Sequence, residues 1–342
     1  MSQSNTLRDD VKDYYGEVLQ SSDDLKTSAC CPIDTVPQFL KPLLANIHDD
    51  VMSRFYGCGS PIPFAIDGAT VLDLGCGTGR DCYLLSQLVG ANGRVIGIDM
   101  TDKQLAVAQA TLDWHTKRFA YSTANVEFQL GLIEDLSAIA DNSIDLVVSN
   151  CVINLSANKP VVFKEIFRVL KPGGELYFSD VFADRRLSTS QQLEKILLGE
   201  CLGGAMYTED FRRMLAATGV ADFRIHSQSP IELHDPEIIK MAGNTQFYSI
   251  TVRAFKLDLE DRCEDYGQVA MYRGGIEHSE DAFKLDDHHL FTINKPVLVC
   301  ANTAAMLSGT RYRSYFEVSE AGQHLGLFDC SNDGENVEPG CC

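Results

Sequence analysis

The sequence has no apolar run that approaches the roughly 18 residues needed to cross a bilayer. Its first fifteen residues also lack the basic start and apolar stretch of a secretory signal, so we expect a cytoplasmic protein. Basic residues are few, since 29 Lys and Arg stand against 48 Asp and Glu and the formal net charge is −19. Such an acidic surface repels phosphates. We therefore do not expect a nucleic acid as partner. A small-molecule substrate, no membrane partner and a monomer are expected as well.

Cysteine pairs with the spacing of zinc sites are also missing, although the chain has 12 cysteines. Closed zinc sites usually use cysteines separated by two to four residues, and apart from directly adjacent cysteines no such pair occurs. In a reducing compartment these cysteines should not build a structural disulfide framework. The composition therefore points to thiol chemistry or to the binding of a soft ion.

Short apolar segments alternate with helical segments through the first half of the chain. Strands are expected at 69–74, 94–99, 125–129, 144–149 and 175–180, and helices at 8–20, 36–50, 81–89, 102–119 and 160–170. Strands rich in Val, Ile and Leu that alternate with helices are typical of a parallel sheet covered on both faces.

A glycine-rich turn, VLDLGCGTG at residues 71–79, follows the first expected strand. Glycines allow a tight turn and a close approach of the backbone to a ligand. The spacing is G-x-G-x-G rather than the G-x-G-x-x-G of dinucleotide enzymes, and Asp73 would face a pyrophosphate unfavourably. Asp73 would suit the ammonium group of a methionine moiety instead. Asp99, which ends the second strand, suits two ribose hydroxyls because its oxygens only accept hydrogen bonds.

Five stretches within residues 65–180 together form one recognisable pattern. They are VLDLGCGTGRD, VIGIDM, the acidic Ile133-Glu134-Asp135, DLVVSN and RVLKPGGELYFSD. With them the chain resembles the Rossmann-like methyltransferases that use S-adenosylmethionine. The resemblance implies that the methionine part lies over the glycine turn, the ribose on Asp99, and the adenine beside Met100. The cofactor contacts expected on these grounds are Asp73, Gly75, Cys76, Gly77, Asp99, Met100, Leu132, Ile133, Glu134, Asn150 and Tyr56.

Three isolated cysteines lie near the place where a substrate is expected. Substrates of open α/β sheets bind beyond the carboxyl ends of the strands, and Cys151 directly follows the fourth strand. Cys58 lies in RFYGCGSP before the first strand, and Cys201 lies in LLGECLGG after the core. A single cysteine is more often a small packed hydrophobe, and we interpret Cys82 and Cys263 in that way. Three thiols from distant segments fit a soft three-coordinate ion at least as well as zinc.

These cysteines in their local contexts are distinctive: YYGEVL with DLKTSAC, RFYGCG, LDLGCGTGRDCYLLSQLVG, VVSNCVINL and GECLGGA. From about residue 10 to residue 285 the chain resembles the arsenite methyltransferases. The resemblance implies that Cys58, Cys151 and Cys201 hold arsenic(III), with Cys30 as a fourth functional cysteine. The implied substrate is arsenite or its glutathione conjugates, and the product is a methylated arsenical. Cys30 then forms a disulfide with a binding cysteine, and glutathione or thioredoxin resets it.

The expected fold is α/β, a Rossmann-like methyltransferase fold with a mostly parallel sheet and helices on both faces, plus an added α+β substrate region and a small C-terminal domain. Four parts are expected: N-terminal helix and thiol-bearing loops at 1–64, cofactor core at 65–182, arsenic-binding region at 183–256, and C-terminal domain with a disordered cysteine-containing tail at 257–342. Two alternatives stay open. One is an ordinary small-molecule methyltransferase with a positioned base, and the other is a metalloid-binding or sensing protein with a methyltransferase-like fold.

Overall fold

The computed structural model describes residues 36–55 and 57–329. The helix expected at 8–20, the candidate residues Cys30 and Tyr56, and the tail from residue 330 lie outside the described residues.

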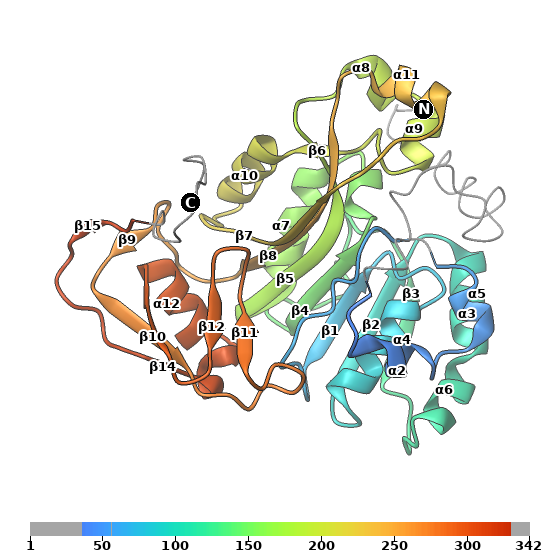
Figure 1. Cartoon of the computed structure of the whole chain (residues 1–342). Coiled ribbons are helices and arrows are strands. Elements are labelled where there is room, and N and C mark those ends of the chain that lie inside the picture. The colour runs from blue at the N-terminus through green and yellow to red at the C-terminus, as the bar shows by residue number, and fades with distance from the viewer. Residues whose placement is uncertain (1–35, 56, 330–342) are drawn as a thin grey trace.

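A mixed sheet forms the centre of the protein, with strand order β3-β2-β1-β4-β5-β8-β7 and with β6 beside β5 (Figure 1). Its strands are β1 (Thr70–Leu74), β2 (Arg94–Asp99), β3 (Val126–Leu130), β4 (Ile144–Asn150), β5 (Leu170–Ala183), β6 (Met206–Tyr207), β7 (Arg224–Pro230) and β8 (Phe247–Phe255). The pairings among β1 to β6 are parallel, and β8 runs antiparallel to both β5 and β7. The mostly parallel sheet predicted from the sequence is thereby confirmed.

Helices cover both faces of this sheet because alternate strand residues point to opposite sides. Val71 packs in one buried cluster, and Leu72 and Leu74 pack in another. The first cluster lies under α2 (Leu40–Leu44), α3 (Asp49–Met52), α4 (Arg80–Val89), α5 (Asp102–Ala110) and α6 (Leu112–Arg118), and the second under α7 (Lys159–Val169) and α10 (Thr208–Ala217).

Two expected helices are broken in the structure. The helix predicted over 102–119 divides into α5 and α6 at Thr111, whose hydroxyl donates to the carbonyls of Val107 and Ala108 (3.3 and 3.1 Å). A threonine hydroxyl that bonds back to the preceding turn disturbs a helix. The helix predicted over 36–50 is replaced by α2 and α3, because His48 is extended and its ring accepts a hydrogen bond from the backbone N–H of Asp50.

The carboxyl end of the sheet is covered by several short elements. They are η4 (Ile153–Leu155), α8 (Thr189–Gln192), α9 (Lys195–Gly199) and α11 (Pro236–Ala242). Leu197 of α9 and Ile238 of α11 pack with Val181 near the end of β5. This cover buries the region in which the sequence predicts the substrate.

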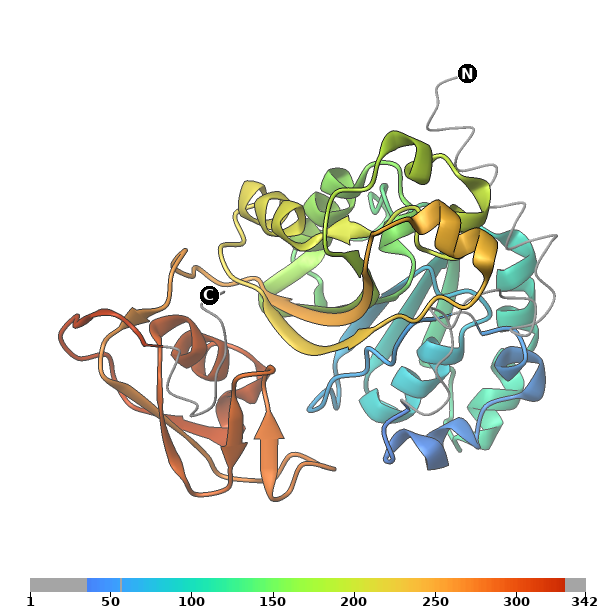
Figure 2. The same ribbon diagram turned by 45° about the horizontal axis from the view of Figure 1, so that its top comes forward.

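The last part of the chain forms a smaller unit beside the sheet, drawn in orange and red in Figure 2. Its elements are β9 (Glu264–Asp265), β10 (Gln268–Tyr272), β11 (Ala282–Lys284), β12 (Leu290–Thr292), β13 (Pro296–Val299), α12 (Ala301–Ser308), η5 (Arg311–Tyr315), β14 (Phe316–Val318) and β15 (Gly326–Leu327). The unit has its own buried cluster, which contains Tyr272, Phe291 and Tyr312. None of the helices described is both long and apolar enough to cross a bilayer.

Candidate active site

The turn between β1 and α4 depends on glycine at two positions. Gly75 has φ +70°, and a Cβ atom there would lie 2.3 Å from the side chain of Val152. Gly77 has φ +54° and open space on its Cβ side. Only glycine adopts such angles without strain. The turn therefore packs against the loop after β4 at Gly75 and leaves room for a ligand at Gly77.

A cleft with about 1130 Å³ of empty space opens over this turn. Apart from Tyr56, which is outside the described residues, every cofactor contact expected from the sequence lines it. The lining residues are Arg54, Phe55, Asp73, Gly75, Cys76, Gly77, Thr78, Arg80, Asp81, Asp99, Met100, Thr101, Gln104, Gly131, Leu132, Ile133, Glu134, Asn150, Cys151, Val152, Leu155, Ser156 and Ala157. Cys151, which is expected to bind the substrate, thus lines the same cleft as the residues expected to bind the cofactor.

Three carboxylates make the cleft suitable for a cation. Burial and then the nearby charge of Asp81 raise the pKa of Asp73 to about 8. The guanidinium of Arg80 pairs with Asp81 at 2.9 Å and lies 3.2 Å from the centre of the Phe55 ring. The charge of Arg80 also lowers the pKa of Asp73, but burial and the charges of Asp81 and Asp99 outweigh it. A ligand with positive charge would relieve the repulsion that holds the pKa of Asp73 high.

Asp99 is held by the backbone at the end of β2. Its two oxygens accept hydrogen bonds from the N–H groups of Gly77 (2.9 Å) and Thr101 (2.8 Å). Burial nevertheless raises the pKa of Asp99. The glycine turn therefore orients the Asp99 carboxylate, and the turn and the carboxylate are expected to bind the ligand together.

Cys82 has a polar role that its interpretation as a packed hydrophobe missed. Its thiol, on α4, donates a hydrogen bond to Asp73 Oδ2 at 3.2 Å. It also hydrogen-bonds to the thiol of Cys76, and both sulfurs lie against Gly97 of β2. Cys82 therefore contacts Asp73 from behind the cleft.

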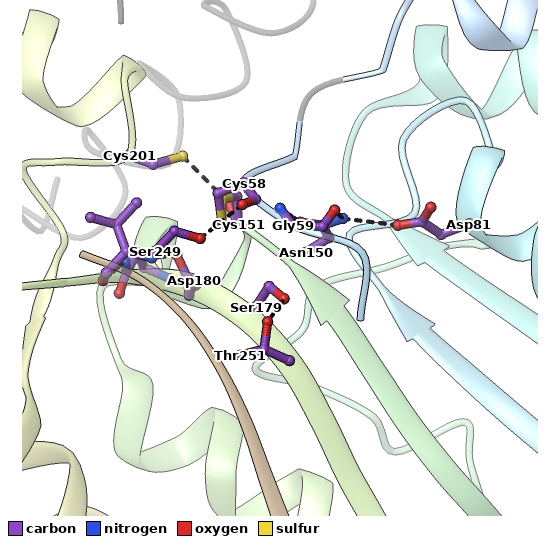
Figure 3. The surroundings of a disulfide bond; sticks show 12 residues. Cys58, Gly59, Asp81, Asn150, Cys151, Ser179, Asp180, Cys201, Ser249 and Thr251 are labelled. Atoms are coloured by element: carbon purple, nitrogen blue, oxygen red, sulfur yellow. Dashed lines mark hydrogen bonds between the residues drawn. A yellow bond between two sulfur atoms is a disulfide. The ribbon is translucent and has the colours of Figure 1, made fainter. Parts of the chain in front are cut away.

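The three cysteines expected to hold the substrate come together at the carboxyl end of β4 (Figure 3). Cys58, Cys151 and Cys201 are all buried, with at most 3% of each residue exposed. The Cys201 thiol donates to the backbone oxygen of Cys151 at 3.4 Å. Cys151 and Cys201 both have positive φ, +58° and +60°. Positive φ is uncommon outside glycine and clusters at functional sites.

Cys58 and Cys151 are joined in a disulfide, a pairing that the sequence analysis did not predict, since the disulfide it expected joins Cys30 to a binding cysteine. The loop after α3 crosses the end of β4 and brings the two Cα atoms to 5.8 Å. A disulfide needs a Cα–Cα separation of this size. Because the two cysteines are 93 residues apart in the sequence, only the fold brings them this close. In this state the two sulfurs are not thiolates, so a set of three thiolates exists only after reduction of the bond.

Asn150 connects the cleft to the cysteines. Its side-chain N–H groups donate to Asp81 Oδ2 (3.0 Å) and to the backbone oxygen of Gly59 (2.9 Å). Its Oδ1 accepts from the N–H of Gly59 at 3.2 Å. Since Gly59 follows Cys58, one amide positions both the helix after the glycine turn and the loop that carries a site cysteine.

Asp180 is a site residue that the sequence analysis did not select. One of its oxygens lies within 4.8 Å of the sulfurs of Cys58 and Cys151. Burial raises the pKa of this carboxyl to about 7, and N–H groups of Val181 and Asn154 bond to its oxygens. The signal was available, because Asp180 ends the fifth predicted strand beside the strand that leads to Cys151. Arg80 and Asp81 were likewise missed, although they follow the glycine turn directly.

Two family models match the chain. One describes a methyltransferase domain and matches residues 66–219. The other describes an arsenite methyltransferase C-terminal domain and matches residues 265–339. The second match covers the smaller unit, most of which lies beyond the stretch of about residues 10–285 on which the resemblance was based.

Similar proteins match over nearly the whole chain. An arsenite methyltransferase of Aquipseudomonas alcaligenes is 51% identical over 96% of this chain and 95% of its own length. An arsenite methyltransferase of Rattus norvegicus is 42% identical over 91% of this chain and 84% of its own. The crystal structure of an arsenic(III) S-adenosylmethionine methyltransferase from Chlamydomonas reinhardtii matches with a TM-score of 0.83 and 45% identity, over 86% of this chain and 99% of that one.

Proposed function

The chain belongs to the arsenite methyltransferase family, and we propose that its cleft transfers a methyl group from S-adenosylmethionine to thiolate-bound arsenic(III). The observation that carries this proposal is the position of three buried cysteines at one end of a cleft lined by carboxylates. An ordinary small-molecule methyltransferase has no need of such a cysteine group. A sensor of metalloids would need the cysteines but not the cleft.

The carboxylates of the cleft fit a cofactor that carries two positive charges. Asp73 would hold the ammonium group, Asp99 the ribose hydroxyls, and the segment from Leu132 to Glu134 the adenine. Met100 would contact the adenine from the other side. We assign residues 65–182 to this role and residues 183–256, with the Cys58 loop, to arsenic.

The Cys58–Cys151 disulfide supports a redox step at the cysteines as part of this proposal. Two electrons and two protons from a thiol reductant, glutathione or thioredoxin, convert the Cys58–Cys151 bond into two thiols. Together with Cys201 they supply three soft ligands for trivalent arsenic, delivered as arsenite or as its glutathione conjugate. A reducing cytoplasm would supply the electrons, and because every residue named comes from one chain, a monomer suffices.

When bound, the cofactor would supply a sulfonium methyl group to the remaining lone pair of arsenic held by three sulfurs. The sulfur–methyl bond would break, and S-adenosylhomocysteine would leave. No general base is required, since this nucleophile carries no proton. The protein's contribution is to position the two reactants, which is worth up to ~7–11 kcal/mol in favourable cases. Methylation formally oxidises arsenic, and a pair of site thiols returns two electrons by closing a disulfide. Cys30 is our candidate for the fourth cysteine in this cycle.

The test is to incubate the reduced protein with methyl-labelled S-adenosylmethionine, glutathione and arsenite, and to look for label on arsenic. We expect methylated arsenicals in the parent protein. Their complete absence, with arsenite still bound, would favour the metalloid sensor instead.

Single variants refine the test. Cys151→Ser and Cys201→Ser should abolish the first methylation, because two sulfurs cannot complete the ligand set. Cys58→Ser should fail at the first or the second methylation, and Cys30→Ser should slow repeated turnover more than arsenite binding. Full activity of either Cys151→Ser or Cys201→Ser would refute the site. Thr303→Val, a buried change in the C-terminal unit, serves as a control.

A further inference from the structure

A second pair of thiols lies in the C-terminal unit, outside the cleft. Cys263 and Cys300 are 4% and 1% exposed, and their thiols are hydrogen-bonded to each other. Cys300 caps α12, where its sulfur accepts a hydrogen bond from the N–H of Thr303 at 3.5 Å. Cys263 lies in the irregular segment between β8 and β9. The fold thus brings together two cysteines that are well separated along the chain.

A buried arginine lies against this pair. Arg224 of β7 places Nη2 3.8 Å from the sulfur of Cys300, and it pairs with Asp222 (2.7 Å) and Asp286 (3.5 Å). The side chain is only 9% exposed, and its Nε is buried without a hydrogen-bond partner among the described residues. An unsatisfied buried donor costs about 1–3 kcal/mol. The pair therefore has a charged donor beside it that a ligand oxygen would satisfy.

We propose that Cys263 and Cys300 form a second binding site for trivalent arsenic, separate from the methylation site. Two cysteine thiols react with arsenous acid, As(OH)₃, to give two sulfur–arsenic bonds and two molecules of water. Arsenic stays trivalent and keeps one hydroxyl group, so no oxidant or reductant is needed. The Nε–H of Arg224 donates to that hydroxyl oxygen. The ligand class follows from the proposed function, in which arsenic(III) is the substrate.

The surroundings favour arsenic(III) over a divalent metal. Arg224, 3.8 Å from the Cys300 sulfur, offers a hydrogen-bond donor, which suits the hydroxyl of arsenous acid but cannot serve as a further ligand to a metal ion. The hydrogen bond with Cys263 and then burial raise the pKa of the Cys300 thiol. A metal would have to expel these protons, whereas the hydroxides of arsenous acid take them away as water. In the described part of the chain, no third cysteine, histidine or carboxylate joins the two sulfurs in a metal-like group.

Entry requires only a local opening. Cys263 belongs to neither a helix nor a strand, so its segment can move without breaking a sheet. Once bound, arsenic would link this segment to the start of α12. Asn302 of α12 already donates to Asp222 at 3.0 Å, in the loop that precedes β7. Arsenic would thereby tighten the junction between the C-terminal unit and the central sheet.

The experiment counts arsenic on the full-length protein without cofactor. Protein reduced with a phosphine is incubated with arsenite, desalted under nitrogen, and analysed for arsenic per chain by mass spectrometry. We expect Cys263→Ser and Cys300→Ser each to hold one arsenic atom fewer than the parent. Serine at 300 can still cap α12, so this variant should fold. Ser308→Ala, also on α12, keeps both thiols and removes a hydroxyl that bonds to the Ala304 carbonyl, so it is the matched control and should bind as much arsenic as the parent.

Thermal unfolding provides a second readout. Arsenite should raise the midpoint of the parent more than that of Cys300→Ser, because a ligand that binds only the folded state stabilises it. Equal arsenic counts and equal midpoint shifts in parent and variants would overturn the proposal. Methylation is measured separately on the same proteins. A protein that yields no methylated arsenic but loses one arsenic in Cys300→Ser would refute the proposed function and leave this site standing.

Discussion

At the scale of single residues, Asp73 is the most perturbed group of the cofactor cleft. It is buried beside two other carboxylates, and its pKa is raised to about 8. Selecting this residue from the sequence was possible because it precedes the glycine turn. Its pKa could not be foreseen, since burial and the distance to Asp81 arise only from folding.

We expect the raised pKa to make cofactor binding depend on pH, because Asp73 is the proposed partner of the ammonium group. With a pKa of about 8, roughly a tenth of Asp73 is ionised at pH 7. A cationic ligand binds the ionised form, so its dissociation constant should fall about tenfold between pH 7 and pH 9. Calorimetry with S-adenosylhomocysteine, which keeps the ammonium group, would measure this change.

Asp73→Asn is the control for that titration, because the ligand's own amine titrates in both proteins. The variant should bind more weakly at pH 9 and should lose the part of the pH dependence that belongs to Asp73. The same pH dependence in parent and variant would show that Asp73 does not face the ligand.

Cys82 offers a second prediction at this scale. Cys82→Ala removes the hydrogen bond to Asp73 and should raise the KM for S-adenosylmethionine roughly three- to tenfold, about 1 kcal/mol, with kcat little changed. Cys82→Ser keeps a donor and should stay close to the parent. Initial rates at varied cofactor concentration separate the two, and an equal KM in Ala and Ser variants would contradict a role for the hydrogen bond.

At the scale of elements, the glycine turn between β1 and α4 joins local geometry to long-range packing. The turn could be predicted from the sequence because its glycine spacing is a local pattern of residue types. The reason for glycine at 75 was not readable, since it is the side chain of Val152, in the loop after β4, that excludes a Cβ. The broken helices at Thr111 and His48 were equally hidden, because hydrogen bonds rather than periodicity break them.

Gly75 and Gly68 form a matched pair for testing this turn. Both have φ +70°, but a Cβ at Gly68 meets nothing within 4 Å. Gly68→Ala should lower the free energy of unfolding by about 1 kcal/mol, which is the backbone cost alone. Gly75→Ala should lose about 1–3 kcal/mol more from overpacking, and cofactor affinity with it.

Val152→Ala in the same chain as Gly75→Ala should recover part of the lost stability, because it removes the clashing methyl groups. Urea denaturation of the single and double variants would measure the recovery. Additive losses in the double variant would mean that the clash is absorbed elsewhere.

At the scale of the whole molecule, a buried ion cluster joins the C-terminal unit to the sheet. Arg253 of β8 donates to Glu175 of β5 at 2.6 Å and to the Tyr312 hydroxyl at 2.6 Å. Arg311 reaches the other oxygen of Glu175 at 2.5 Å. Burial alone would raise the pKa of Glu175, but the two guanidinium groups outweigh it and lower that pKa.

Glu175→Gln would leave two arginines without their counter-charge. We expect it to lower the free energy of unfolding by about 3–5 kcal/mol, as for other broken buried ion pairs. Amide exchange should rise in the C-terminal unit as its attachment loosens. Arg273→Gln is the matched control, since its pair with Glu317 is exposed and should be worth less than about 1 kcal/mol. Equal losses in the two variants would argue against the cluster as the link.

Local sequence was sufficient for the parallel sheet, the glycine turn and its carboxylates, because periodicity and residue type report local conformation and chemistry. The expectation that Cys58, Cys151 and Cys201, among 12 cysteines, hold arsenic came from the family resemblance of their local contexts. Folding alone decided that Cys58 and Cys151 are bonded, that Asp180 lies beside them and that Cys263 meets Cys300. These are contacts between segments distant along the chain, and only the packing of the strands and the C-terminal unit sets their separations.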